Sequence, residues 1–77
     1  MSGNFYDDVE ELCRLLIEAG QVPLGEEIRL AVEASSTGSE TMMRLRRLLT
    51  DALRDRQSPE ELRARMTTVI QAIERVL

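Results

Sequence analysis

The stretch STGSETMMRLRRLL, residues 36–49, decides the fold class because a helix start signal is followed at once by a helical repeat. Thr37 and Glu40 have the spacing of a capping box, in which the hydroxyl and the carboxylate each bind a backbone N–H of the first turn. Ser36 or Ser39 could take the cap position instead. Each of these arrangements predicts that a helix begins here.

Beyond this start signal, apolar side chains recur every three or four residues. Such a repeat places them on one face of a helix, where they can pack against a core. The members of this face are Met42, Leu45, Leu48, Leu49, Ala52 and Leu53. We predict a helix over residues 38–55, with Gly38 allowing a sharp turn ahead of it.

Two helices are predicted upstream, over residues 4–19 and 24–34. Asn4 is a suitable N-cap residue for the first of them. Gly20 is placed to end that helix in the left-handed conformation, and Pro23 prevents the helix from resuming. The second helix is therefore expected to begin after Pro23.

The last helix, over residues 59–77, has the plainest start signal in the chain. Ser58 is expected to cap it, with Pro59 at the first helical position, where no backbone N–H is needed, and with Glu61 completing the signal. Helices joined by short loops pack side by side and roughly antiparallel. The sequence thus predicts an all-α fold, a compact bundle of four helices that forms a single domain over residues 1–77.

The composition argues against catalysis and against a bound metal or cofactor. The chain has no histidine and no lysine, so the side chains that usually carry protons near neutral pH are missing. Cys13 is the only cysteine, so it has no partner for a disulfide within the chain and no imidazole to activate it. It lies on or beside the apolar face of the first helix, where a thiol behaves as a small hydrophobic side chain. We expect no catalytic, cofactor-binding or metal-binding site.

Two features favour a cytoplasmic location. A single cysteine suits a reducing compartment, and the first residues lack the basic and apolar regions of a signal peptide. No apolar run approaches the roughly 20 residues that are needed to span a membrane. We expect a cytoplasmic protein without a membrane partner.

Charge is divided unevenly along the chain. Residues 1–40 hold two arginines and nine acidic residues, a net charge of −7, whereas residues 41–65 hold seven arginines and four acidic residues, a net charge of +3. The arginines of the second region are Arg44, Arg46, Arg47, Arg54, Arg56, Arg63 and Arg65. They could contact phosphates, so a nucleic-acid-binding accessory protein is the alternative function. The total charge of −4 and the presence of only two aromatic residues argue against nucleic acid as a partner.

The arginines could also line solvent-exposed faces, where they would pair with Asp51, Asp55 and the acids of the first two helices. A small protein with one acidic and one basic surface is, in addition, suited to docking onto another protein or onto a copy of itself. The two interpretations are compatible. They predict a small non-catalytic interaction protein whose protein partner is not specified by the sequence.

Three apolar side chains, Leu15, Leu30 and Met43, fall outside the apolar faces of their helices. The first helix could bury both flanks between two neighbours in the bundle, which would explain its wide apolar arc without a partner. We expect instead that the three residues form an interface in a homodimer. Arg44 and Arg47 should lie at its rim, opposite acids of the first helix.

Overall fold

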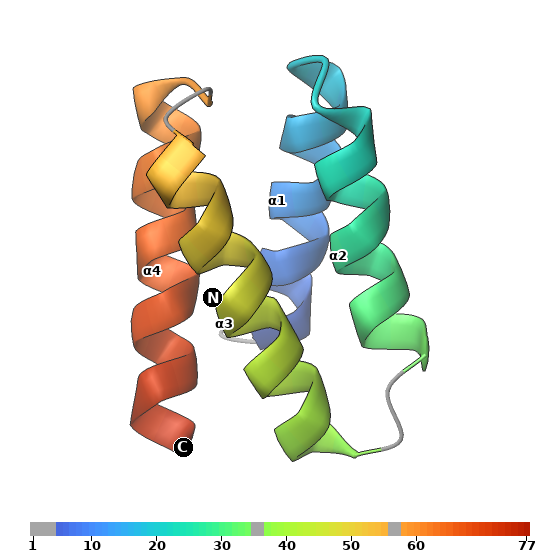
Figure 1. Ribbon diagram of the computed structural model, residues 1–77, viewed down its shortest axis with the longest axis vertical. Coiled ribbons are helices and arrows are strands. Elements are labelled where there is room, and N and C mark those ends of the chain that lie inside the picture. Colours follow the sequence, from blue (N-terminus) through green and yellow to red (C-terminus); the bar gives the residue numbers. More distant parts are fainter. Residues whose placement is uncertain (1–4, 35–36, 56–57) are drawn as a thin grey trace.

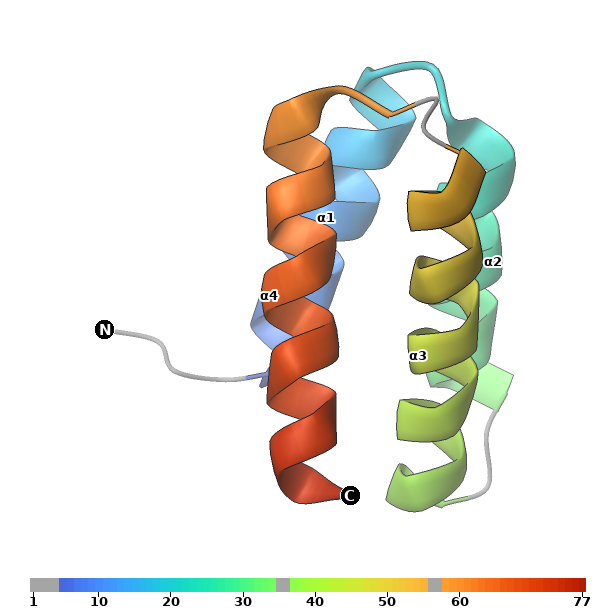
Figure 2. The ribbon, with the colours of Figure 1, turned by 60° about the vertical axis from the view of Figure 1, so that its left-hand side comes forward.

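The computed structural model describes residues 5–34, 37–55 and 58–77, and nearly all of them are helical. The helices are α1 Phe5–Glu18, α2 Val22–Ala34, α3 Gly38–Asp55 and α4 Glu60–Val76. They run alternately up and down, so that each is antiparallel to the next (Figure 1, Figure 2). Each helix packs against its sequence neighbours, and α4 closes the ring by packing against α1. The predicted all-α four-helix bundle is confirmed.

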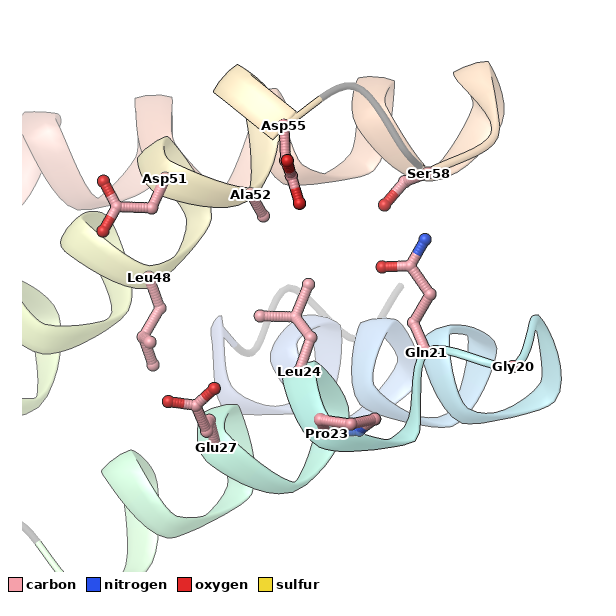
Figure 3. A pocket seen from close by; sticks show the side chains of 10 residues that line it. All are labelled: Gly20, Gln21, Pro23, Leu24, Glu27, Leu48, Asp51, Ala52, Asp55 and Ser58. Atoms are coloured by element: carbon pink, nitrogen blue, oxygen red, sulfur yellow. The ribbon is translucent and has the colours of Figure 1, made fainter.

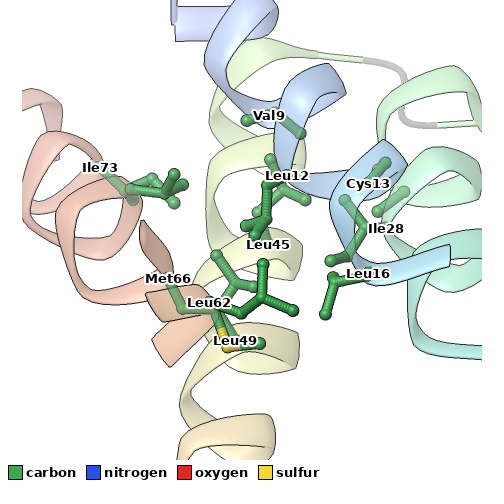
Figure 4. Close-up of a cluster of buried hydrophobic side chains, with 12 residues drawn as sticks. Val9, Leu12, Cys13, Leu16, Ile28, Leu45, Leu49, Leu62, Met66 and Ile73 are labelled. Carbon is green, nitrogen blue, oxygen red and sulfur yellow. The ribbon is translucent and has the colours of Figure 1, made fainter. Parts of the chain in front are cut away.

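The core is formed by apolar side chains from all four helices (Figure 4). Leu16, Ile28, Leu45, Met66 and Ile73 are completely buried. Burial of a side chain of this size stabilises the folded state by roughly 1.5–3 kcal/mol. The other buried apolar residues are Val9, Leu12, Cys13, Ala31, Leu49, Leu62 and Val69. The apolar faces predicted from helical periodicity are therefore the faces that pack inward.

Helix α1 ends in the way that its glycine predicts. Gly20 has a φ angle of 89°, in the left-handed region that favours glycine. The N–H of Gln21 donates to the carbonyl of Leu16 at 2.9 Å, and the N–H of Gly20 donates to the carbonyl of Ile17 at 3.1 Å. This pair of bonds is a Schellman motif, which satisfies carbonyls at the helix end. Asn4, the predicted cap at the other end of α1, lies outside the described residues.

Helix α2 begins at Val22, two residues earlier than predicted, so Pro23 lies inside its first turn. The backbone N–H groups of a first turn have no partner within the helix, so proline costs no hydrogen bond there. The expectation that the helix starts only after Pro23 is wrong for this reason.

Gly25 marks a close approach between α1 and α2. A Cβ atom at this position would lie 2.8 Å from Cγ1 of Ile17 and 3.3 Å from the carbonyl oxygen of Cys13. Both separations are shorter than ordinary van der Waals contact between such atoms. The lack of a side chain at Gly25 therefore lets the two helices pack as they do.

Helix α3 has the boundaries that the sequence predicts. The N–H of Glu40 donates to Oγ1 of Thr37 at 3.1 Å, so Thr37 is the cap. The N–H of Thr41 donates to the carbonyl of Thr37 at 3.1 Å and begins the helical hydrogen bonds. Ser39 does not take the cap position, and Ser36 lies outside the described residues.

Helix α4 starts differently from the prediction. Pro59, with φ −57° and ψ 153°, occupies the N-cap position, and no side chain caps the helix. The expected cap, Ser58, lies one residue further from the helix and is buried. The guanidinium of Arg63 donates to the carbonyl of Leu53 at 2.9 Å, which joins the first turns of α4 to the last turn of α3.

Candidate interaction surface

A long groove runs between α2 and α3. It consists of two adjoining hollows of about 540 and 460 Å³, which share Glu27, Leu48 and Asp51 as lining residues. We call it the α2–α3 groove. Its α2 wall contains Leu24, Glu27, Leu30 and Ala34, and its α3 wall contains Arg44, Arg47, Leu48, Asp51, Ala52 and Asp55.

The groove brings together three of the five residues that the sequence assigned to an interaction surface. Leu30, Arg44 and Arg47 all line it, and Leu30 is 56% exposed. Met43 is also 56% exposed, but it does not line the groove. Leu15 is half-buried and packs against the core, and α1 has a neighbour on each side, α2 and α4. Leu15 is therefore not the exposed residue that the helical pattern alone indicated.

Apolar side chains run along the middle of the groove. Leu24 and Leu48 are half-buried members of the layer that packs on the core, and Ala52 lies beside them. Leu30 extends this apolar strip toward the other end of the groove. The strip is open to solvent along its outer side and is flanked by charged residues.

The charges along the groove change sign from one end to the other. Arg44 and Arg47 line one end. At the other end Asp55, Gln21 and Ser58 extend toward the same hollow from α3 and from the connections on either side (Figure 3). Glu27 and Asp51 lie between the two ends. The groove thus has a basic end and an acidic end within one surface.

Most of these charges have no partner among the described residues. Glu27, Arg47, Asp51 and Asp55 make no side-chain hydrogen bond or ion pair within that part of the chain. Arg44 makes a long contact of 3.5 Å with Glu40. The last residue of α3 is Asp55, where the helix dipole is negative, so its carboxylate does not favour the helix. The charges of the groove are therefore not explained by the stability of their own helices.

Two arginines outside the groove, Arg14 and Arg29, are paired within their own helices. Arg14 contacts Glu11 at 2.6 Å and Glu18 at 2.8 Å, and Arg29 contacts Glu26 at 2.7 Å. The expected pairing of the α3 arginines with acids of α1 and α2 is not found in the described residues. Acids one helical turn away are nearer partners than acids on another helix, and α1 lies diagonally across the bundle from α3.

The arginines do not gather on one face. Arg65 lines a separate hollow of about 260 Å³ together with Phe5, between α4 and α1. Arg63 is half-buried and donates to a backbone carbonyl, and Arg56 lies outside the described residues. Because the α1–α4 seam is on the far side of the ring from the α2–α3 groove, Arg65 is remote from Arg44 and Arg47. Among the described arginines, Arg65 therefore does not share a surface with Arg44 and Arg47.

Cys13 is buried in the core, as the sequence predicts (Figure 4). Burial raises the pKa of its thiol above the usual value, although the positive charge of Arg29 partly opposes the change. A thiol with a raised pKa is largely protonated near neutral pH and reacts slowly. Within the described residues, no group of three or more His, Cys, Asp or Glu side chains is arranged to hold a metal ion. No described helix is both long and apolar enough to cross a membrane.

Comparisons with models of known families, with curated proteins and with solved structures find no match for this chain. Four further residues line the groove but were not assigned to an interaction surface from the sequence: Glu27, Leu48, Asp51 and Asp55. The spacing of Arg44, Arg47, Asp51 and Asp55 by three or four residues was a signal for one side of a helix. That spacing does not predict which side of α3 packs against α2.

Proposed function

We propose that this protein is a small non-catalytic interaction module that self-associates as a homodimer through the α2–α3 groove. The observation that carries the proposal is the exposed Leu30 beside the half-buried Leu24 and Leu48, with charges of both signs around them. An apolar centre with a polar rim is the usual anatomy of a protein interface. A protein partner with the same pattern of charges would compete for this surface.

Self-association supplies what a small bundle lacks. A chain of 77 residues buries a limited core, and association adds stability by removing more apolar surface from water. The net charge of −4 opposes the approach of two copies. The groove, however, carries charges of both signs, so it can attract the same groove of a second copy locally.

Analytical ultracentrifugation tests the proposal. At about 100 μM, a dimer of micromolar affinity is mostly assembled, and we expect twice the 8.8 kDa mass of one chain. Leu30→Glu places a charge in the apolar strip and should shift the protein to monomer. Met43→Glu is a matched control, because Met43 is equally exposed but lies outside the groove. A monomeric wild type, or equal loss of the dimer in both variants, would count against the proposal.

Nucleic-acid binding through the arginines of α3 and the start of α4 is the competing outcome. A gel-shift series in rising salt separates the two functions, because binding through phosphates weakens steeply with salt. We expect no shift at low salt. A shift that disappears with salt and with Arg44→Ala and Arg47→Ala would replace the proposed function by the alternative.

A further inference from the structure

The groove side of α3 carries an ordered run of charges. Successive members are one or three residues apart, and together they lie on one side of the helix. They are Arg44, Arg47, Leu48, Asp51, Ala52 and Asp55. The basic residues come first, the acidic residues come last, and Leu48 and Ala52 are the apolar members.

We propose that two copies of the chain dock with their α3 helices antiparallel across a two-fold axis. Arg44 then faces Asp55 of the second copy, and Arg47 faces Asp51 of the second copy. This register rests on the proposed self-association and adds its orientation and its specific contacts. A parallel pair would place arginine against arginine and aspartate against aspartate.

The spacing of the charges fits one axis. With a rise of about 1.5 Å per residue, Arg44 and Asp55 are about 16 Å apart along α3. The midpoint between Arg44 and Asp55 lies within about 1 Å of the midpoint between Arg47 and Asp51 along the helix. Both pairs can therefore form about the same two-fold axis, and no shift of register is needed to make the second pair after the first.

Leu48 and Ala52 lie on either side of that axis, so Leu48 faces Ala52 of the second copy. A large side chain opposite a small one lets two helices approach to the usual separation of about 8–10 Å. Leu30 of α2 borders the same strip and adds apolar contact beside the crossing. Charge pairing and apolar packing thus favour the same register.

Arg44 contacts Glu40 of its own helix at 3.5 Å, and this contact would have to be shared or given up in the dimer. For Arg47, pairing within one chain is a weak competitor. Arg47 and Asp51 are four residues apart, but the basic residue comes first, which is the less favourable order on a helix. No ion pair between them is formed in the structure, and neither side chain has another partner among the described residues. Asp55 lies at the negative end of α3, where a guanidinium from a second copy would offset the unfavourable dipole interaction.

Charge reversal tests the pairing. Two-fold symmetry makes each contact twice, so Arg47→Glu or Asp51→Arg alone creates two like-charge contacts, and we expect a dimer at least about tenfold weaker in ultracentrifugation. The Arg47→Glu, Asp51→Arg double variant restores opposite charges and should recover the affinity to within about threefold. Arg65→Glu, on the α1–α4 seam, is the control and should have no effect. Circular dichroism confirms that each variant remains helical.

Cross-linking tests the orientation. In a Cys13→Ala background, Arg44→Cys and Asp55→Cys chains are mixed with a thiol-reactive linker of about 10 Å, the spacing of packed helices. The antiparallel register predicts cross-links in the mixture, whereas Arg44→Cys alone gives none, because its two copies are about 16 Å apart along the axis. Self-linking of Arg44→Cys, or single reversals that leave the dimer intact, would overturn the register while self-association stands. A monomeric wild type would overturn both.

Discussion

Replacing Gly25 by alanine should destabilise the bundle, although the same change within a helix usually stabilises it. Alanine gains about 1 kcal/mol over glycine in helix propensity. The new Cβ atom, however, would lie 2.8 Å from Cγ1 of Ile17 and 3.3 Å from the carbonyl oxygen of Cys13. Ile17 is β-branched, and such a side chain has one strongly preferred χ1 rotamer in a helix, so it cannot turn aside without cost.

The expected magnitude follows from these opposing effects. Overpacking a fitted contact costs about 1–3 kcal/mol, which exceeds the gain in propensity. We expect Gly25→Ala to lower the free energy of unfolding by about 1 kcal/mol, and Tm by about 4–8 °C for a domain of this size. In an Ile17→Ala background the nearest atom is gone, so the same change should be neutral or stabilising. The coupling between the two sites should be about 1–2 kcal/mol.

Thermal unfolding followed by circular dichroism measures all four proteins of this double-mutant cycle. Ile17 is 39% exposed, so its truncation alone should cost little. Gly38→Ala is the control, because a Cβ atom at Gly38 has no neighbour within 4 Å and the change should not depend on Ile17. If Gly25→Ala raises Tm as much as Gly38→Ala does, the close contact between α1 and α2 is not what keeps glycine there.

Three other changes test local features of the fold. Thr37→Ala removes the cap of α3 and should lower the free energy of unfolding in urea by about 1 kcal/mol, whereas Ser39→Ala should leave it within about 0.5 kcal/mol. Arg63→Ala removes the hydrogen bond to the last turn of α3 and should cost about 1 kcal/mol, whereas Arg65→Ala should be neutral; equal effects would mean that the bond contributes nothing. Burial raises the pKa of Cys13, so the unfolded chain ionises first as pH rises. Below the ordinary thiol pKa, Cys13 should therefore not make the free energy of unfolding depend on pH; above that pKa, the free energy of unfolding should fall as pH rises. In the Cys13→Ala variant this fall at alkaline pH should be absent.

The features that the sequence predicted correctly depend on residues close together in the chain. Thr37 caps α3 by accepting a hydrogen bond from the N–H of Glu40, three residues further along the chain. Gly20 lies two residues beyond the end of α1, and the bonds that terminate this helix come from Gly20 and Gln21. The apolar faces also follow from periodicity within one helix. For these reasons the boundaries of α3 and most of the core were accessible without a structure.

The errors concern choices that neighbouring residues do not decide. Proline is compatible with both an N-cap and a first-turn position, so Pro23 and Pro59 gave helix starts that were shifted in opposite directions. The burial of Leu15 and the contact at Gly25 depend on which helices lie beside α1. The residues that line the groove likewise depend on which side of α3 faces α2. That orientation is set by how all four helices pack together.

The ring has one interface unlike the others. The α1–α2, α2–α3 and α3–α4 contacts join helices that follow one another, whereas the α1–α4 contact joins the two ends of the described chain. Closing the long segment between these ends costs more entropy than closing a short connection, and contacts between sequence neighbours form faster. We therefore expect folding to proceed from helical hairpins to a closed ring, with the α1–α4 seam formed last and opened first. We expect the central α2–α3 pair, and with it the groove, to stay packed when α1 and α4 separate.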